Sequence, residues 1–140
     1  MSSSRRVESV IVLLSLFSTI IGCGGPTLLP AAGTVQFDDG SPVQTGVVEF
    51  RSTDGEYRGA SKISNEGAFA LETLDGQSGV PAGQYDVIVV QLVITEDLSL
   101  ADHNHGKPVP RKYADYFTSG LKVDVTPENA SNLVVRVARQ

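Results

Sequence analysis

The sequence predicts an all-β fold: a seven-stranded antiparallel Greek-key sandwich, preceded by a signal helix that is cleaved off. Three observations favour this fold. Turn-forming residues recur about every ten positions after residue 30, and the short runs between them, rich in Val, Ile, Phe and Tyr, alternate apolar with polar residues. The third observation concerns helices: no stretch after the signal combines helical periodicity with capping residues.

The chain opens with a short positive segment and an apolar run, which is the pattern of an export signal. Arg5 and Arg6 precede an apolar stretch from Val10 to Ile21 that two serines and one threonine interrupt. About a dozen residues are too few for a helix to cross the hydrocarbon core of a bilayer, which takes roughly 20. Residues 1–22 are therefore expected to be a signal peptide removed on export.

The end of the apolar run predicts what kind of signal this is. Ile20-Ile21-Gly22-Cys23 resembles the bacterial lipobox. In proteins with that motif the cysteine thiol receives a diacylglyceryl group, a peptidase cuts between the residues that are Gly22 and Cys23 here, and the new amino terminus is acylated. Cys23 is the only cysteine in the chain, so it has no internal disulfide partner. The alternative is an unpaired thiol behind an ordinary signal peptide.

Lipid on Cys23 would hold the protein to a membrane on the extracytoplasmic side of the cell envelope. Gly24 follows in place of an aspartate retention signal, which favours the outer membrane in a diderm cell. Without Arg5, Arg6 and Glu8, the 11 basic and 16 acidic residues fall to 9 and 15, so the net charge moves from −5 to −6. That charge argues against nucleic acid as a partner and leaves the membrane and an unknown envelope protein or glycan.

The mature chain divides into a tether and one domain. Residues 23–30 form a short lipidated tether whose glycines and prolines favour neither a helix nor a central strand. Residues 31–140 are enough for one domain with a modest core. Its strands are expected at Ala32–Phe37, Gly46–Arg51, Arg58–Ile63, Ala68–Thr73, Gly83–Leu92, Leu121–Val125 and Asn132–Ala138.

Turns and one long connection separate these strands. Gly40, Gly55 and Gly67 each end a polar triplet at a position where a tight turn needs a positive φ. The stretch from Val87 to Ile94 is almost continuously apolar, which predicts a central strand covered on both faces. The stretch from Thr95 to Ser119 is long and irregular, so it is either a functional excursion or a packed meander across one end of the sandwich.

Four segments occur in a particular order along the mature chain. They are Gly33-Thr-Val-Gln-Phe-Asp-Asp-Gly40, Gly46-Val-Val-Glu-Phe50, Asn65-Glu-Gly-Ala-Phe69 and Val80-Pro-Ala-Gly-Gln-Tyr-Asp-Val87. This order resembles carboxypeptidase regulatory-like domains, and Pro110-Arg-Lys-Tyr-Ala-Asp115 is similar to the ending of short bacterial lipoproteins built from one such domain. The resemblance implies a transthyretin-like (prealbumin-like), immunoglobulin-like sandwich without catalytic residues. Independently of the family, the ring of Tyr85 is expected to fill one end of the sandwich while its hydroxyl reaches a backbone group.

One pair of histidines is a candidate metal site. His103 and His105 are two residues apart, a spacing that on extended backbone puts both imidazoles on one side of an ion. Zinc or copper would need further ligands, such as Asp102, Asp97 or Glu96. A solvated polar loop fits the same residues and is the interpretation we favour, so no metal or cofactor is expected.

Carboxylates in the turns are a second candidate site, because calcium prefers oxygen ligands. Their spacing matches no calcium loop, and aspartate favours turns for its own local hydrogen bonds. We therefore expect local hydrogen bonds at these residues: Asp38, Asp39, Asp54, Glu56, Glu66 and Asp75.

A group of basic and aromatic residues is a third candidate. Residues 108–113 and the pair Tyr116-Phe117 form either a surface for a peptide or glycan, or a cover in which Tyr113 and Phe117 close an edge or end of the sandwich. We favour the cover.

The function predicted from these patterns is that of a non-enzymatic, lipid-anchored cell-envelope lipoprotein that acts as an interaction or structural module. No Gly-x-Ser-x-Gly motif occurs and both histidines lie in one loop, so no nucleophilic catalysis is expected. The alternative, from a different class, is a metal- or carbohydrate-binding lipoprotein that uses the loop of residues 96–116.

Overall fold

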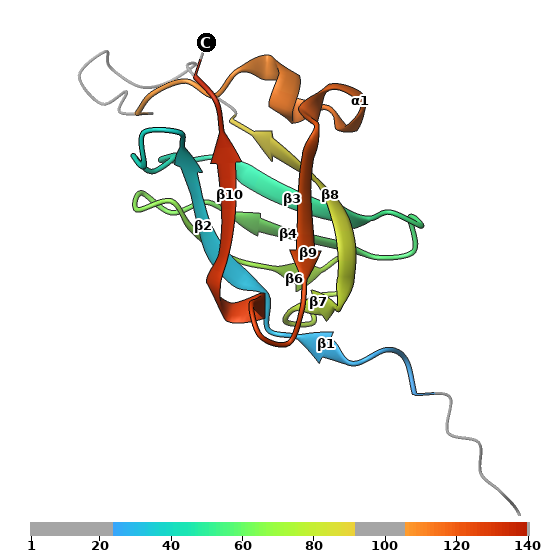
Figure 1. Cartoon of the computed structure of the whole chain (residues 1–140). Coiled ribbons are helices and arrows are strands. Elements are labelled where there is room, and N and C mark those ends of the chain that lie inside the picture. Colours follow the sequence, from blue (N-terminus) through green and yellow to red (C-terminus); the bar gives the residue numbers. More distant parts are fainter. Residues whose placement is uncertain (1–23, 92–105, 140) are drawn as a thin grey trace, which may run out of the picture.

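The computed structural model describes residues 24–91 and 106–139, and this part of the chain is an all-β sandwich (Figure 1). The expected signal helix lies outside the described residues. No helix within the two described ranges is long and apolar enough to cross a membrane. The elements of these ranges are β1 (Leu28–Leu29), β2 (Ala32–Phe37), β3 (Val47–Ser52), β4 (Arg58–Lys62), β5 (Ala68–Ala70), β6 (Glu72–Thr73), β7 (Val80–Pro81), β8 (Gly83–Val90), the 3-10 helix η1 (Arg111–Ala114), α1 (Tyr116–Ser119), β9 (Leu121–Val125), the 3-10 helix η2 (Ala130–Asn132) and β10 (Leu133–Val137).

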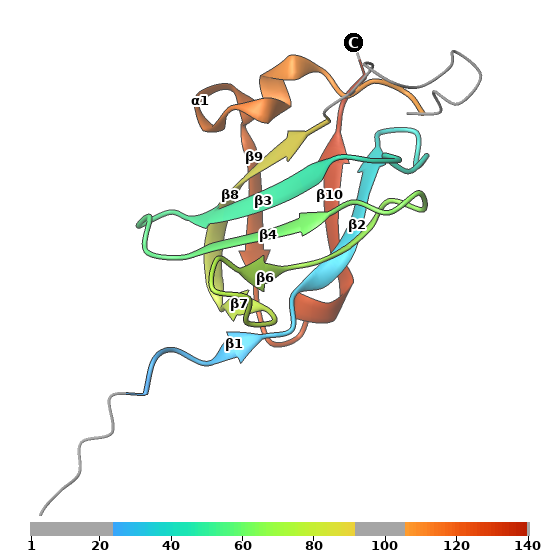
Figure 2. The ribbon, with the colours of Figure 1, turned by 180° about the vertical axis from the view of Figure 1, so that it is seen from behind.

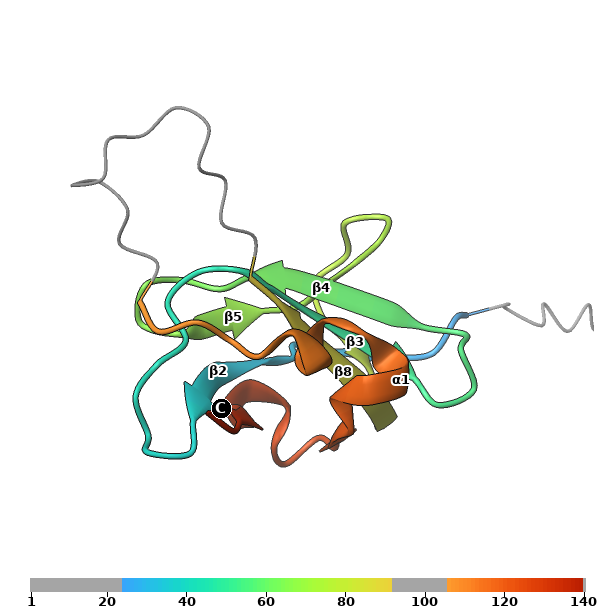
Figure 3. The same cartoon turned by 90° about the horizontal axis from the view of Figure 1, so that it is seen from above.

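Two larger sheets form the layers of the sandwich. One has five antiparallel strands in the order β6-β4-β3-β8-β9, and the other has three in the order β10-β2-β5. A small sheet of β1 and β7 lies at one end. Figure 3, which looks along the sandwich from the opposite end, shows β3, β4 and β8 in one layer and β2 in the other.

The core lies between these layers and is built from alternate residues of their strands. Val35 and Phe37 of β2 and Val135 of β10 belong to the same buried cluster as Phe50 of β3 and Val87 of β8, and none of the five is more than 1 % exposed. This alternation follows from the two-residue period of a strand, which places every second side chain on the inner face. The predicted period-2 pattern is therefore what builds the core.

The prediction of purely antiparallel sheets is wrong at one place, because β10 runs parallel to β2. The chain leaves β9 in one sheet, passes through η2 and enters β10 in the other sheet, where it lies beside β2 in the same direction. Gly33 allows this approach. A Cβ atom built there would lie 1.9 Å from the carbonyl oxygen of Leu133, so no larger residue fits without moving the backbone.

Strands lie at all seven expected places, but the fourth is divided into β5 and β6. Ala70 pairs with Ala32 in one sheet and Glu72 pairs with Ala60 in the other. Leu71 lies at the corner between them, 1 % exposed, and its N–H donates to the carbonyl of Ala31 at 2.8 Å. The alternation of buried residues continues through this corner, so the sequence pattern did not reveal the change of sheet.

The expected turns are confirmed, and so is the central strand as far as Val90, where β8 ends; residues 92–94 of the expected strand lie outside the described residues. Gly40, Gly55 and Gly67 have φ values of +82°, +79° and +80°. In β8, which lies between β3 and β9, Val87 and Val89 point into the core and Ile88 on the other face is also buried. The outer face is covered because η1 and α1 pack against β8. The described part of the long connection, residues 106–119, is therefore a packed meander.

The strands give the molecule two distinct ends, which Figures 1 and 2 show from opposite sides. We call the end formed by β1, β7 and the turn of residues 73–79 the tether end. The distal end holds η1, α1, the turn of residues 38–41 and the residue that follows Ala138. The ring of Tyr85 is 1 % exposed at the tether end, and its hydroxyl donates to the carbonyl of Pro81 at 2.7 Å, which confirms its predicted role.

Candidate functional site

The expected cleavage and lipidation residues and the possible metal ligands lie outside the described part of the chain. This holds for Gly22 and Cys23 at the expected cleavage and lipidation site, and for the possible metal ligands Asp102, His103 and His105. Within residues 24–91 and 106–139, no group of three or more His, Cys, Asp or Glu side chains is placed to hold a metal ion. The structure therefore directs attention to the surface beside the long connection.

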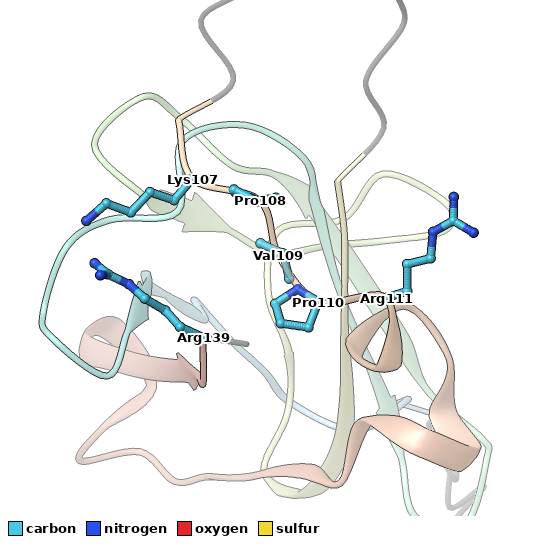
Figure 4. Close-up of a pocket in the computed structure, with 6 residues that line it drawn as sticks. All are labelled: Lys107, Pro108, Val109, Pro110, Arg111 and Arg139. Atoms are coloured by element: carbon cyan, nitrogen blue, oxygen red, sulfur yellow. The ribbon is translucent and has the colours of Figure 1, made fainter.

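A hollow of about 550 Å³ lies at the distal end (Figure 4). We call it the distal hollow, and its lining residues are Lys107, Pro108, Val109, Pro110, Arg111 and Arg139. The lining comes from two places far apart in the sequence: residues 107–111, which lead into η1 and include its first residue, and Arg139, two residues after the end of β10. Its volume lies in the range of small-molecule sites.

Prolines and a buried tyrosine hold the wall of this hollow. Pro110 has φ −56° and ψ 136° immediately before η1, and Val109 N–H donates to the side-chain oxygen of Gln91 at 3.1 Å. Tyr113 is 5 % exposed, and its hydroxyl accepts a hydrogen bond from the N–H of Ala138 at 2.8 Å. This bond ties η1 to the chain just before Arg139, so both sides of the hollow are fixed to one another.

The Asp39 carboxylate forms ion pairs with both cations at the rim of the hollow. Asp39 forms ion pairs with Arg139 and with Lys107, whose Nζ lies 3.6 Å from the Asp39 Oδ2. The hydroxyl and N–H of Ser41 also donate to Asp39, at 2.6 and 3.0 Å, and these bonds with the two cations lower the pKa of Asp39 to about 2. At neutral pH the trio therefore carries one net positive charge. In Figure 4 the Arg111 side chain points away from the other two cations.

Of the six turn carboxylates, Asp39, Asp54, Glu66 and Asp75 accept the local hydrogen bonds that the sequence predicts, whereas Asp38 and Glu56 accept none from the described residues. Asp54 accepts from the Ser52 hydroxyl at 2.5 Å and from the N–H of Glu56 at 3.0 Å. Asp75 accepts from the Thr73 hydroxyl at 2.5 Å and from the Gln77 amide at 2.7 Å. The hydroxyl bonds are the main reason why the pKa values of both aspartates are lowered. These carboxylates stabilise their own turns.

The three aromatic residues of the long connection do not share a surface. Tyr113 is buried and closes the distal end, as predicted. Tyr116 lies over the outer face of the five-stranded sheet, where its hydroxyl donates to Glu49 at 2.9 Å and the Arg51 guanidinium lies 3.8 Å from its ring centre. Burial and the bond to Glu49 raise the pKa of Tyr116. Phe117 is 97 % exposed, so the prediction that it covers the sandwich is wrong.

Phe117 is exposed because of the geometry of α1. The helix is only one turn long, begins with Asp115 accepting from the Phe117 N–H at 2.7 Å, and ends at Gly120 with φ +66°. Tyr116 and Ser119 take the two positions that face the sheet, and the Ser119 hydroxyl donates to the carbonyl of Val87 at 2.5 Å. Phe117 is left on the opposite side of the turn.

Sequence reasoning missed two features of the distal end. Asp39 and Arg139 are 100 residues apart, and no pattern connects them. Thr45 has φ +120°, which is rare for a β-branched residue, and its buried hydroxyl oxygen has no hydrogen-bond partner among the described residues. The only sequence signal was Gly46, which follows Thr45 and has a φ of +123°. Strained residues of this kind cluster at functional sites.

Comparisons with known proteins identify no relative of this chain. No protein-family model matches this sequence, and neither a curated protein nor a solved structure matches it. The resemblance to carboxypeptidase regulatory-like domains therefore stays a prediction, and the function has to be argued from the residues of this chain.

Proposed function

We propose that this chain is a lipoprotein of the bacterial cell envelope. It is cut between Gly22 and Cys23, lipidated on Cys23, and displays a non-enzymatic β-sandwich that serves as an interaction or structural module. We propose that the sandwich is of the transthyretin-like type, which the resemblance to carboxypeptidase regulatory-like domains implies. For a diderm cell we propose the outer membrane, because Gly24 follows the cysteine.

The observation that best supports this proposal is that the chain between Cys23 and the sandwich is a short, exposed segment. Residues 24–27 are exposed, and a Cβ atom at Gly24 or Gly25 would have nothing within 4 Å. The first strand begins directly after them, at Leu28. A free segment of this kind is what a lipid anchor needs, since the acyl chains must enter the bilayer while the sandwich stays outside it. Each buried CH₂ contributes about 0.8 kcal/mol to anchoring.

The titratable groups of the described part favour binding over catalysis. Asp54 and Asp75 have lowered pKa values because they are held in turn hydrogen bonds. Burial raises the pKa of Tyr85 to about 12, and burial also raises that of Tyr116. Each of these four pKa shifts stabilises the charge state that the group already has at neutral pH. A general acid or base instead needs a pKa near the working pH.

Mass spectrometry of the chain, expressed with its own signal in a diderm bacterium, tests the proposal. The expected amino-terminal peptide begins at Cys23 and carries the mass of a diacylglyceryl group, and the protein fractionates with membranes. The matched variant Cys23→Ser should lose both the modification and the membrane association. If the variant still fractionates with membranes as the native protein does, lipid on Cys23 is not the anchor. Recovery of the native protein in the inner membrane contradicts the sorting proposal alone.

A second candidate function is ligand binding through residues 96–116, and the distal hollow is the observation that favours it. The described part of that segment supplies five of the six lining residues. Lys107 and Arg139 at the rim and the Pro108–Pro110 wall fit a ligand with a negative group on an apolar body. Two-dimensional NMR during titration with zinc chloride, and separately with neutral and acidic oligosaccharides, tests this. Shifts confined to the hollow support it, and unchanged spectra throughout contradict it.

A further inference from the structure

A large apolar side chain is exposed at the tether end. Leu74 is 78 % exposed, although it follows a strand residue, Thr73, that pairs in the five-stranded sheet. Isolated exposed apolar residues are common on protein surfaces, so exposure alone assigns no role. Its position and its rigidity are what distinguish Leu74.

The turn that carries Leu74 is held by a closed set of hydrogen bonds. The N–H of Thr73 donates to the carbonyl of Gln77 at 2.8 Å, and the N–H of Gly76 donates to the carbonyl of Thr73 at 2.9 Å. The Thr73 hydroxyl accepts from the N–H of Gln77 at 3.0 Å and donates to Asp75 at 2.5 Å. Because both ends of the turn are fixed in this way, Leu74 is presented to solvent by the backbone.

Leu74 lies beside the tether. A hollow of about 310 Å³ counts Gly25, Pro26 and Leu28 of the amino-terminal segment among its lining residues, together with Tyr57 and Leu74. The exposed leucine and the segment that leads back to Cys23 therefore belong to one surface. The turn of residues 73–79, which joins β6 to β7, and the segment that leads into β1 lie at the same end of the sandwich (Figure 2).

The length of the tether sets how far this surface can be from a bilayer. Four residues, 24–27, separate Cys23 from Leu28. At no more than about 3.6 Å per residue, the first strand lies within roughly 18 Å of Cys23 even when the tether is fully extended. The headgroup layer is only about 5–8 Å thick on each side of the hydrocarbon core. A relaxed tether of five steps spans roughly 12 Å, at about 5–6 Å × √n for a flexible chain, so the tether end lies close to the headgroups.

We propose that the tether end is a second membrane-contact surface, in which Leu74 inserts among the lipid headgroups and so fixes the orientation of the sandwich on the bilayer. This inference rests on the proposed lipidation of Cys23. The partner is the lipid surface itself, contacted by apolar insertion. The same hollow is lined by two exposed carboxylates, Glu56 and Asp75, and by one exposed cation, Arg58, which forms an ion pair with Glu49 at 3.7 Å. Its net charge is therefore negative, so anionic lipid weakens the contact.

This orientation places the distal end away from the membrane. β8 runs from the tether end to the distal end over eight residues, which at about 3.3 Å per residue is roughly 26 Å. The distal hollow and Phe117 then face the surrounding compartment. A lipid-anchored sandwich without a second contact would tumble on its tether and show no preferred end.

A fluorescent label at position 74 tests the proposal on the full-length chain purified with its own lipid. Leu74→Cys gives a single free thiol, because Cys23 is then acylated and no other cysteine exists. The matched control is Phe117→Cys, since Phe117 is even more exposed but lies at the distal end. Each variant is labelled with an NBD dye and reconstituted into phosphatidylcholine vesicles, with and without phosphatidylglycerol.

The expected result is a blue shift and a several-fold gain of NBD emission at position 74 on adding vesicles, with no change at position 117. A lipid-borne quencher placed high in the acyl chain should quench only the label at 74, and phosphatidylglycerol should reduce the effect. Equal, water-like emission at both positions, with acylation verified by mass spectrometry, overturns this inference and leaves the lipoprotein proposal standing. Membrane-like emission at both positions also overturns it. A protein with no acyl group on Cys23 overturns both.

Discussion

The two ends of the sandwich are built in opposite ways. At the tether end the backbone approaches itself closely: a Cβ at Gly33 or Gly79 would lie 1.9 or 2.0 Å from a carbonyl oxygen of a neighbouring segment. The buried hydroxyl of Tyr85 has its partner there. At the distal end Thr45 has a strained φ and a buried hydroxyl without a partner among the described residues, and a hollow of about 550 Å³ opens.

The two ends of this small domain therefore suit different tasks. A closely packed end suits attachment, because a fixed geometry transmits the position of the anchor to the rest of the sandwich. A strained and hollowed end suits recognition, because strained residues cluster at functional sites and a hollow can receive part of a partner. Five predictions test whether the ends differ as described.

The largest effect is expected from Gly33→Ala at the tether end. The added methyl group would lie 1.9 Å from the Leu133 carbonyl oxygen, and because that atom belongs to the backbone of β10, the two strands must separate. We expect a loss of about 3 kcal/mol in the free energy of unfolding, the upper end for overpacking. Urea unfolding measures it. Gly25→Ala, where nothing lies within 4 Å, is the matched control and should change little. Equal losses of unfolding free energy in the two variants would show that the backbone is no more closely packed at Gly33 than at Gly25.

The next effect compares two buried tyrosine hydroxyls. Tyr85→Phe leaves the buried Pro81 carbonyl without its bond, whereas Tyr113→Phe leaves the N–H of half-buried Ala138, which water can reach. We expect about 1–2 kcal/mol of destabilisation for Tyr85→Phe and about half of that for Tyr113→Phe. Thermal unfolding of both variants measures the difference, and a larger loss at Tyr113 would reverse the comparison.

The pH dependence of the unfolding free energy above pH 10 gives a second test of the Tyr85 hydroxyl. Burial raises the pKa of Tyr85 from 10.0 to about 12, so the unfolded chain loses this proton first as the pH rises. The contribution is complete below pH 10 and is lost between about pH 10 and 12. Tyr85→Phe should therefore flatten the fall in unfolding free energy over that interval.

A gain in stability is expected at the distal end from Thr45→Gly. Glycine adopts a φ of +120° without a Cβ clash and removes the unpartnered hydroxyl. We expect the free energy of unfolding to rise by about 1 kcal/mol, with part of the relief offset by the greater freedom of glycine in the unfolded chain. Thr45→Val keeps the strain and removes only the hydroxyl, so it should gain less. A loss of stability in the glycine variant would show that the strain is not where the structure places it.

The smallest effect concerns the ion pairs at the rim of the distal hollow. The Ser41 bonds and the two cations lower the pKa of Asp39 from 3.8 to about 2, so the unfolded chain takes up this proton first as the pH falls. The contribution is present above about pH 4 and is lost as the pH falls toward 2. Asp39→Asn should abolish this part of the acid dependence, with only a small change at neutral pH because the group is exposed. An unchanged acid limb in Asp39→Asn would contradict the assignment.

Much of the fold could be predicted from local patterns because strands and turns obey local rules. The alternation in β9 and β10 and the positive φ values of Gly40, Gly55 and Gly67 follow from the residues themselves. The parallel pairing of β10 with β2 could not be predicted, since it depends on which sheet the chain enters after η2. The corner at Leu71 was hidden because buried residues continue to alternate through it.

The candidate site was less predictable than the fold. Asp39 and Arg139 meet only because β2 and β10 lie side by side, and no local pattern reports such a meeting. Phe117 was assigned to the cover because aromatic residues usually pack, but a one-turn helix has room for only two side chains against the sheet. Tyr116 and Ser119 take those places.

The pairing of β2 with β10 also has a consequence for the order of folding. It joins residues 100 positions apart, Gly33 with Leu133, so most of the chain must be available before the smaller sheet can close. Contacts of this separation slow folding, because the entropy of closing a long loop is lost before the contacts form. A chain that crosses a membrane amino terminus first would therefore remain open until β10 has emerged. If the chain is exported as we propose, this delay would keep it unfolded enough to pass through the export channel.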